Sequence, residues 1–328
     1  MIKLTVNEND AGQRLDRFLK KHFRRAPLSH IYKIIRKDLK VNGRRAKEDT
    51  LLEEGDELSF YMSDETYEQL TRPEKKKPAK KQFAVIYEDS EVLIVSKPWG
   101  LLTHGDAREK KKTLANQVIG YLQEKGEYDP AVEHTFVPSP VNRLDRNTSG
   151  LVIFGKTAKS LRLLTRLIRE RQAIEKYYLT IVAGNMQKPM TLEGDLVKDE
   201  RTNTVRVTSD HAKAEYAPDL TKAKWAVTEV TPLESSGEYT LAEVKLVTGR
   251  THQIRTSLAH EGFPLVGDAK YGSKAVNKKL EKLGLNTQLL HAYKLVFGEM
   301  PEELKGLSGK TILSQPPEFF EGIRKELL

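Results

Sequence analysis

Six apolar runs of strand length in the larger, C-terminal part of the chain place the strongest limit on its fold. They are FAVIY, EVLIV, LVIF, YYLTIV, AVTEV and LAEVKLV. Short apolar runs rich in β-branched and aromatic residues are typical of buried strands. Amphipathic helical stripes are fewer, and the clearest is AKSLRLLTRLIRERQ at residues 158–172. The pattern predicts a strand-rich α+β domain over residues 83–328.

The segment TRPEKKKPAKKQ separates this region from the residues that precede it. Two prolines and a run of lysines interrupt every hydrophobic period in it, as is typical of a linker. The sequence therefore predicts a small domain at 1–70, a basic linker at 71–82 and a larger domain at 83–328.

The small domain has the pattern of two helices followed by a β element. LDRFL carries apolar residues at i, i+3 and i+4 from Leu15, and a similar stripe follows Pro27, where Ser29 is available as a cap. The turn dipeptides Asn-Gly and Gly-Asp, and the run LSFYM, then predict short strands and hairpins.

The positive charge of the chain is concentrated in this small domain. Between Arg14 and Lys47 there are thirteen lysines and arginines against two acids, whereas residues 82–328 have 35 basic and 32 acidic side chains. Such a patch is the electrostatic footprint of a phosphate backbone, although a charge run can also be only a solvated face. The candidate contacts to nucleic acid are Arg14, Arg17, Lys33, Arg36, Lys37, Arg44 and Arg45.

The tetrapeptide RLDR occurs twice, in two different contexts. In GQRLDRFLKK it belongs to the first helix, whereas in VNRLDRNTSG it follows two prolines and precedes the strand LVIF. Asp145 is therefore predicted to lie on a loop that enters a strand, between Arg143 and Arg146. A carboxylate held there can be a reactive group, or it can merely cap a turn.

A second cluster of polar residues follows a predicted strand in LVTGRTHQIRTSLAHEG. Arg250, Thr251, His252, Gln253 and Arg255 crowd the start of a predicted helix. Such donors can bind an anion or a carboxylate. The alternative is a capped helix with surface arginines and a structural histidine.

Together these motifs resemble a known family. NRLDRNTSGLVIF, EKYYLTIVAG, TGRTHQIRTSL, PLVGDAKYG and LLHAYKLVF, in this order, are similar to the motifs of the RluA-type RNA pseudouridine synthases, most of all to the RluC-like large-subunit rRNA members. GQRLDRFLKK through DELSF resembles an S4 RNA-binding domain. The resemblance implies a small S4-like α/β domain, followed by a strand-rich, mixed-sheet catalytic domain.

The resemblance also implies a reaction and its residues. The expected substrate is uridine in structured RNA, in first place 23S-type ribosomal RNA. The uridine would be isomerised to pseudouridine after base flipping, without a cofactor. Asp145 matches the essential aspartate, which either attacks C1′ or removes a ribose proton, and Arg255 matches the arginine that pairs with it. Tyr178 matches the tyrosine that stacks on the uracil and can assist proton removal at C5, so Tyr177 would face the opposite side of its strand. Arg143 matches the arginine that fills the stack left by the flipped base.

Two departures from the family pattern stand out. Asn142 replaces a common histidine before Arg-Leu-Asp, and Glu299-Met300 replaces a His-Pro at a position that concerns packing. The predicted catalytic set is intact. The alternatives are a synthase that acts on transfer RNA, a glycosidase, which would need a second carboxylic acid near Asp145, and a non-catalytic RNA-binding protein.

Composition excludes several other classes of protein. The 328 residues include no cysteine, which excludes disulfides and thiolate metal sites, and no pair of the eight histidines has the spacing of a zinc helix. No apolar run approaches the roughly 18 residues of a membrane span, and MIKLTVNEND lacks the core of a signal peptide. We therefore expect a cytoplasmic monomer with no metal, nucleotide cofactor or membrane segment.

Overall fold

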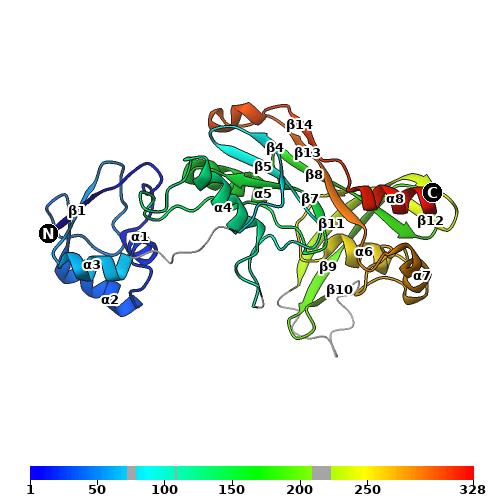
Figure 1. Cartoon of the computed structure of the whole chain (residues 1–328), viewed down its shortest axis with the longest axis horizontal. Coiled ribbons are helices and arrows are strands. Elements are labelled where there is room, and N and C mark those ends of the chain that lie inside the picture. The colour runs from blue at the N-terminus through cyan, green and yellow to red at the C-terminus, as the bar shows by residue number, and fades with distance from the viewer. Residues whose placement is uncertain (72–78, 108, 209–222) are drawn as a thin grey trace. The chain divides into compact units, whose positions relative to one another are not determined.

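A computed structural model describes residues 1–71, 79–107, 109–208 and 223–328 of the chain (Figure 1). The chain forms two compact units. The first comprises Met1–Lys81, Ala115–Ser139 and Gly155–Arg162, and the second comprises Gln82–Leu114, Pro140–Phe154 and Leu163–Leu328. Most of the predicted linker, at residues 72–78, lies outside the described residues. The domain boundaries drawn from the sequence stay predictions.

The N-terminal part of the first unit packs helices against a small sheet. Its strands pair antiparallel in the order β1-β3-β2. The predicted helical stripe is confirmed, because Leu15, Phe18 and Leu19 are fully buried in one hydrophobic cluster. The elements are β1 (Ile2–Thr5), α1 (Leu15–His22), α2 (Leu28–Lys33), the π-helical turn η1 (Ile34–Asp38), β2 (Leu39–Val41), β3 (Glu57–Phe60) and α3 (Asp64–Thr71).

Three details of this part differ from the sequence prediction or extend it. The prediction of Ser29 as a helix cap was wrong, because Pro27 occupies the N-cap position of α2 and no side chain caps that helix. The strand β1 and the helix α3 were not predicted. The predicted Asn-Gly turn is present, and both Asn42 (φ 50°) and Gly43 (φ 74°) have the left-handed backbone that such hairpin turns require.

The second unit is built on a large mixed sheet. In the described residues its strands follow the order β10-β9-β11-β12-β8-β13-β7-β5-β4, with β14 on β13 and β6 on β7. The strand β13 pairs parallel with β7 and antiparallel with β8, so the sheet is mixed, as predicted. The strands are β4 (Ala84–Glu88), β5 (Val92–Lys97), β6 (Ser139–Pro140), β7 (Ser149–Gly155), β8 (Ile174–Ala183), β9 (Met190–Asp199), β10 (Thr204–Thr208), β11 (Lys224–Ser235), β12 (Tyr239–Leu246), β13 (Leu290–Phe297) and β14 (Thr311–Leu313).

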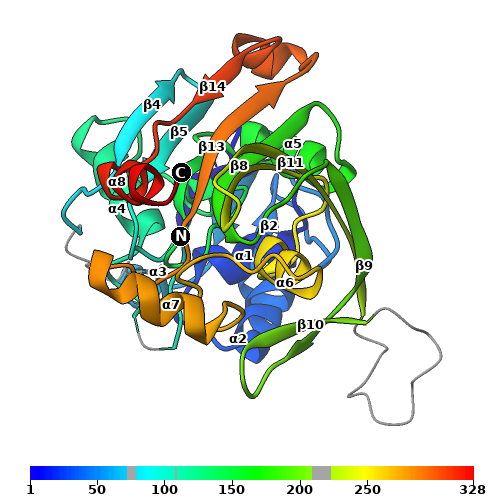
Figure 2. The same cartoon turned by 90° about the vertical axis from the view of Figure 1, so that its right-hand side faces the viewer.

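Helices pack on this sheet through their apolar faces. Leu164 and Leu167 of α5 belong to a buried cluster with Ile153 of β7 and Phe297 of β13. Figure 2 shows α6 in the curve formed by β11, β9 and β10, and α6 contacts all three strands. The remaining elements are α4 (Leu114–Glu124), α5 (Ala158–Glu170), α6 (Gln253–His260), α7 (Lys274–Leu280), η4 (Glu281–Leu283), η5 (Glu302–Leu307) and α8 (Glu318–Leu327).

One glycine fixes where the loop before β7 enters the sheet. Gly150 has φ 110° and pairs with Ala292 of the neighbouring strand β13, and a Cβ at this position would overlap the Ala292 carbonyl group. Only glycine combines this backbone with so close an approach. The residues that precede Gly150 are thereby held at the junction of β7 and β13.

None of the helices within the described ranges combines the length and the apolar character of a membrane-spanning segment.

Candidate active site

Asp145 lies on the loop between β6 and β7, as the sequence predicted. Hydrogen bonds fix the backbone on both sides of it: the Thr103 hydroxyl donates to the Leu144 carbonyl oxygen at 3.0 Å, and the Lys97 ammonium donates to the Arg146 carbonyl oxygen at 3.0 Å. The Asp145 side chain is 30% exposed. The loop therefore holds a carboxylate rigidly and leaves it reachable.

Arg255, in the first turn of α6, contacts this carboxylate. Its Nη1 donates to Oδ2 of Asp145 at 2.9 Å. Its Nε and Nη2 donate to the two carboxylate oxygens of Asp268, at 2.6 and 2.9 Å. Although burial alone lowers the pKa of Arg255, its pairing with Asp268 and Asp145 raises that pKa. The two residues singled out from separate motifs are thus an ion pair, and a third residue joins them.

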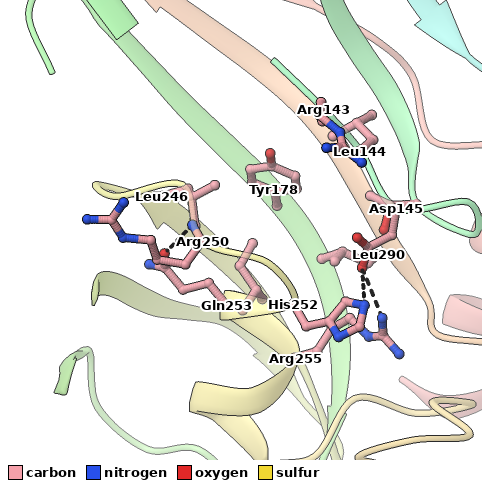
Figure 3. Close-up of a pocket in the computed structure, with 12 residues that line it drawn as sticks. Arg143, Leu144, Asp145, Tyr178, Leu246, Arg250, His252, Gln253, Arg255 and Leu290 are labelled. Carbon is pink, nitrogen blue, oxygen red and sulfur yellow. Dashed lines mark hydrogen bonds and ion pairs between the residues drawn. The ribbon is translucent and has the colours of Figure 1, made fainter. Parts of the chain in front are cut away.

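His252 approaches Asp145 from the same side as Arg255. Its Nε2 lies 3.9 Å from Oδ2 of Asp145, and its Nδ1 is 2.9 Å from the Tyr271 hydroxyl group. The backbone of His252 is left-handed, with φ 53°, which turns the ring toward the carboxylate just before α6 begins. Burial lowers the pKa of His252. Figure 3 shows His252 and Arg255 both directed at Asp145.

Tyr178 lies across from Asp145 on β8. It is 5% exposed and lines the same pocket as Asp145 and Arg255. Burial, and then the negative charge of Asp145, raise the pKa of Tyr178, so its phenol is protonated at neutral pH. The neighbouring Tyr177 instead donates to Glu175 at 2.7 Å and lies below the Lys294 ammonium. The side chains of the two tyrosines therefore lie on opposite faces of the strand.

A cavity of about 910 Å³ opens onto Asp145 and lies within the second unit. Its size is that of a small-ligand pocket. Two acids, Asp106 and Asp145, line it, against a larger number of basic groups. These basic groups are His104, Arg143, Arg146, Lys176, Lys198, Arg250, His252, Arg255 and Lys270. Such a lining attracts an anionic ligand.

The two departures from the family pattern have structural explanations. Asn142 donates to the Leu151 carbonyl oxygen at 3.2 Å and accepts the Ile153 N–H at 2.9 Å, so it ties the Asp145 loop to β7. Met300 is buried in the hydrophobic cluster beneath α5, as expected for a position that concerns packing. Among the described residues, neither side chain has a hydrogen bond or ion pair with Asp145.

The basic residues singled out in the N-terminal part of the first unit are all exposed. Arg14 donates to Asp16 at 3.0 and 3.1 Å, and Arg45 donates to the Arg36 carbonyl oxygen at 2.6 Å, which brings the hairpin after β2 against η1. Their contact with RNA stays a prediction. The exposed candidates are Arg14, Arg17, Lys33, Arg36, Lys37, Arg44 and Arg45.

Lys97 is a residue that sequence reasoning missed. It lies at the end of β5 and is fully buried, and its ammonium donates to the carbonyl oxygens of Pro98, Leu101 and Arg146. The signal that could have found it is a lysine inside the apolar run VLIVSKPWG, because buried lysines are rare unless they have partners. Lys97 ties the loop after β5 to the loop that carries Asp145.

The lowered pKa of Lys97 predicts that the stability of the folded protein depends on pH. Burial lowers that pKa to about 7, whereas the unfolded chain retains the ordinary value near 10.5. Between these values the unfolded state binds more protons, so stability rises with pH. We expect the free energy of unfolding of the wild type, relative to that of Lys97→Met, to increase by about 2 kcal/mol from about pH 7 to about pH 9.

Urea unfolding of both proteins at the two pH values measures this difference. A constant difference between wild type and Lys97→Met would contradict the prediction, because it would mean that Lys97 keeps its ordinary protonation in the folded protein.

Within the described residues, no group of three or more His, Asp or Glu side chains is arranged to hold a metal ion.

Comparisons with known proteins agree on one family. The family model described as RNA pseudouridylate synthase matches residues 91–260. An uncharacterized RNA pseudouridine synthase of Mycoplasma capricolum is 33% identical, covering 96% of this chain and 98% of its own. The ribosomal large subunit pseudouridine synthase C of Escherichia coli K12 is 31% identical, covering 90% and 88%.

A solved structure shares the fold. The human protein named RNA Pseudouridylate Synthase Domain Containing 4 superposes with a TM-score of 0.56 at 22% identity, over 73% of this chain and 90% of its own. At that identity the likeness concerns the fold of the chain.

Proposed function

Because this chain belongs to the RNA pseudouridylate synthase family, we propose that it isomerises specific uridines to pseudouridine in large-subunit ribosomal RNA, and that Asp145 acts on the ribose. The enzyme is an RNA pseudouridine synthase, an isomerase. Relatives that match nearly its whole length are named for the large ribosomal subunit, which supports rRNA as the substrate.

One observation carries the proposed site: the Asp145 carboxylate is held by Arg255 at a cavity whose charged lining residues are mainly basic. The reaction breaks the N1–C1′ bond of uridine and joins C1′ to C5, while C5 loses a proton and N1 gains one, so every non-hydrogen atom of the product comes from the substrate. No cofactor enters it. The protein must supply an ionised carboxylate, a place for a flipped base and exclusion of water.

The other side chains have proposed roles around Asp145. The carboxylate either attacks C1′ or removes a ribose proton, and Arg255 keeps it ionised by charge and hydrogen bonding. The ring of Tyr178 stacks on the uracil. Because its phenol is protonated at neutral pH, Tyr178 assists proton removal at C5 as a hydrogen-bonding group rather than as a phenolate. Arg143, which is exposed at the cavity, fills the stack that the base leaves.

Mapping pseudouridines in RNA tests this proposal. Total RNA is compared between cells with the gene and cells without it. We expect particular large-subunit rRNA pseudouridines to disappear without the gene and to return with the wild-type gene. Loss of tRNA pseudouridines alone would contradict the rRNA substrate, and an unchanged RNA would contradict the function.

We further propose that the protein acts in the cytoplasm as a monomer, and that its N-terminal basic residues bind the RNA. Four exposed side chains with no ion pair among the described residues can be replaced by glutamine: Arg36, Lys37, Arg44 and Arg45. We expect weaker RNA binding and a slope of log affinity against log salt that is flatter by roughly 0.7–0.9 for each phosphate that the variant no longer neutralises. The single-turnover rate at saturating RNA should stay within about twofold of wild type.

A matched variant of equal charge serves as the control. It replaces four exposed lysines on α7 and η4 by glutamine: Lys274, Lys278, Lys279 and Lys282. We expect its salt slope to remain close to that of the wild type. If both quadruple variants had the same slope, only overall charge would matter, and the proposed N-terminal contact with RNA would be excluded.

A further inference from the structure

The motif PLVGDAKYG forms a turn beside Asp145, and the proposed mechanism gives it no role. Its Asp268 is fully buried and accepts hydrogen bonds from the N–H groups of Lys270 and Tyr271, at 2.8 and 3.1 Å. Its own carbonyl oxygen accepts the Gly272 N–H and the Asn277 amide. The carboxylate is thus fixed by the backbone of its own turn before any other side chain is considered.

Asp268 holds Arg255 from the side opposite to Asp145. Its two oxygens accept hydrogen bonds from Nε and Nη2 of Arg255, at 2.6 and 2.9 Å. The third nitrogen, Nη1, donates to Asp145 at 2.9 Å. A guanidinium group is planar, so a two-point contact on one edge fixes the direction of the remaining N–H groups. The ring of Tyr271 lies 5.1 Å from the Arg255 guanidinium carbon and restricts it further.

The charges of Asp145, Arg255 and Asp268 balance only in part. The Arg255 and Asp268 side chains are 7% and 0% exposed, so neither charge can rely on water. One cation is shared by two carboxylates, and Asp145 therefore keeps a negative charge that Arg255 neutralises only in part. A free guanidinium would pair with Asp145 through two N–H groups and make the carboxylate less reactive.

We propose that Asp268 is a positioning residue, which directs a single N–H of Arg255 at Asp145 and shares the charge of Arg255. This inference rests on the proposed function, since it concerns the reactivity of the same carboxylate. Asp268 acts on the reaction only through Arg255. Its removal should therefore matter when Arg255 is present, and should not matter when Arg255 is absent.

A double-mutant cycle tests the proposal on the full chain. Single-turnover pseudouridine formation is measured with saturating rRNA for wild type, Asp268→Asn, Arg255→Leu and the double variant. We expect Asp268→Asn to slow the reaction by about tenfold or more in the wild-type background, and to change the rate of Arg255→Leu by less than about twofold. Affinity for RNA should stay unchanged in Asp268→Asn.

Asp89→Asn is the matched control. Asp89 also accepts two backbone N–H groups of its own turn, from Glu91 and Val92, in the same unit, but it lines no part of the cavity. We expect Asp89→Asn to reduce thermal stability and to leave the rate per folded molecule unchanged.

Three outcomes would overturn the inference about Asp268. The first is a wild-type rate in Asp268→Asn, the second is an equal loss in both backgrounds, and the third is a loss in Asp89→Asn as large as that in Asp268→Asn. If Asp268→Asn failed to fold, Arg255→Leu and the double variant would still decide, because the inference requires equal rates in these two. If the wild type made no pseudouridine, the proposed function would fail instead.

Discussion

Replacing Asp145 by asparagine is expected to abolish pseudouridine formation, with a loss of at least about 10³-fold in the single-turnover rate. The amide has nearly the shape of the carboxylate and can still accept the N–H of Arg255, but it is neither a nucleophile nor a base. Because the shape of the cavity is kept, RNA affinity should stay within about tenfold of wild type.

A second acid of the same cavity provides the control for this experiment. Asp106 also lines the cavity, at 46% exposure, with an Arg146 nitrogen 3.7 Å away. Asp106→Asn removes the same charge from the same space, and we expect its rate to stay within about threefold of wild type. Substantial turnover by Asp145→Asn, or an equal loss in Asp106→Asn, would show that Asp145 is not the reacting carboxylate.

Removal of Arg255 is expected to have the second largest effect. Arg255→Leu takes away the only side-chain hydrogen-bond partner of Asp145 found in the described residues, and it removes the ion-pair partner of the buried Asp268, which keeps only its backbone hydrogen bonds. We expect a rate loss of about 100-fold at neutral pH and a lower thermal stability, since an uncompensated buried charge costs roughly 3–5 kcal/mol. The loss of rate reports on the reaction, and the loss of thermal stability reports on folding.

Lysine at the same position separates charge from geometry. Arg255→Lys keeps the charge, but an ammonium group lacks the planar fork that joins Asp145 and Asp268. We therefore expect it to recover stability and only part of the rate. Single-turnover rates and thermal unfolding of the two variants provide the comparison. A fully active Arg255→Leu would show that the ion pair has no part in the reaction.

The larger elements of the fold could be predicted because their signals are local. Alternating and continuous apolar runs predicted strands that the structure contains, and the stripe at residues 158–172 became α5 (Ala158–Glu170). The strand β1 was missed, because four residues next to the N-terminus carry little pattern. Its pairing with β3 depends on residues more than fifty positions away, and a local pattern contains no information about such a partner.

Some residues of the candidate site could also be predicted from the sequence, and others could not. The resemblance singled out Asp145, Tyr178 and Arg255, and the structure brings these three to one pocket. Asp268 lies inside the quoted motif PLVGDAKYG, but neither it nor Lys97 was singled out, because the role of each comes from side-chain contacts that only the fold creates. Lys97 meets the Arg146 carbonyl group 49 positions away, and no spacing rule in the sequence connects the two.

The most direct test of the proposed reaction measures the bond exchange itself. Large-subunit rRNA labelled with tritium at C5 of uridine is incubated with the wild type, with Asp145→Asn and with Asp106→Asn, because joining C1′ to C5 releases the C5 hydrogen to water. We expect tritium release by the wild type and Asp106→Asn at a few defined uridines, and none above background by Asp145→Asn. Release by Asp145→Asn at the wild-type rate, or no release by the wild type, would contradict the central role of Asp145 in this reaction.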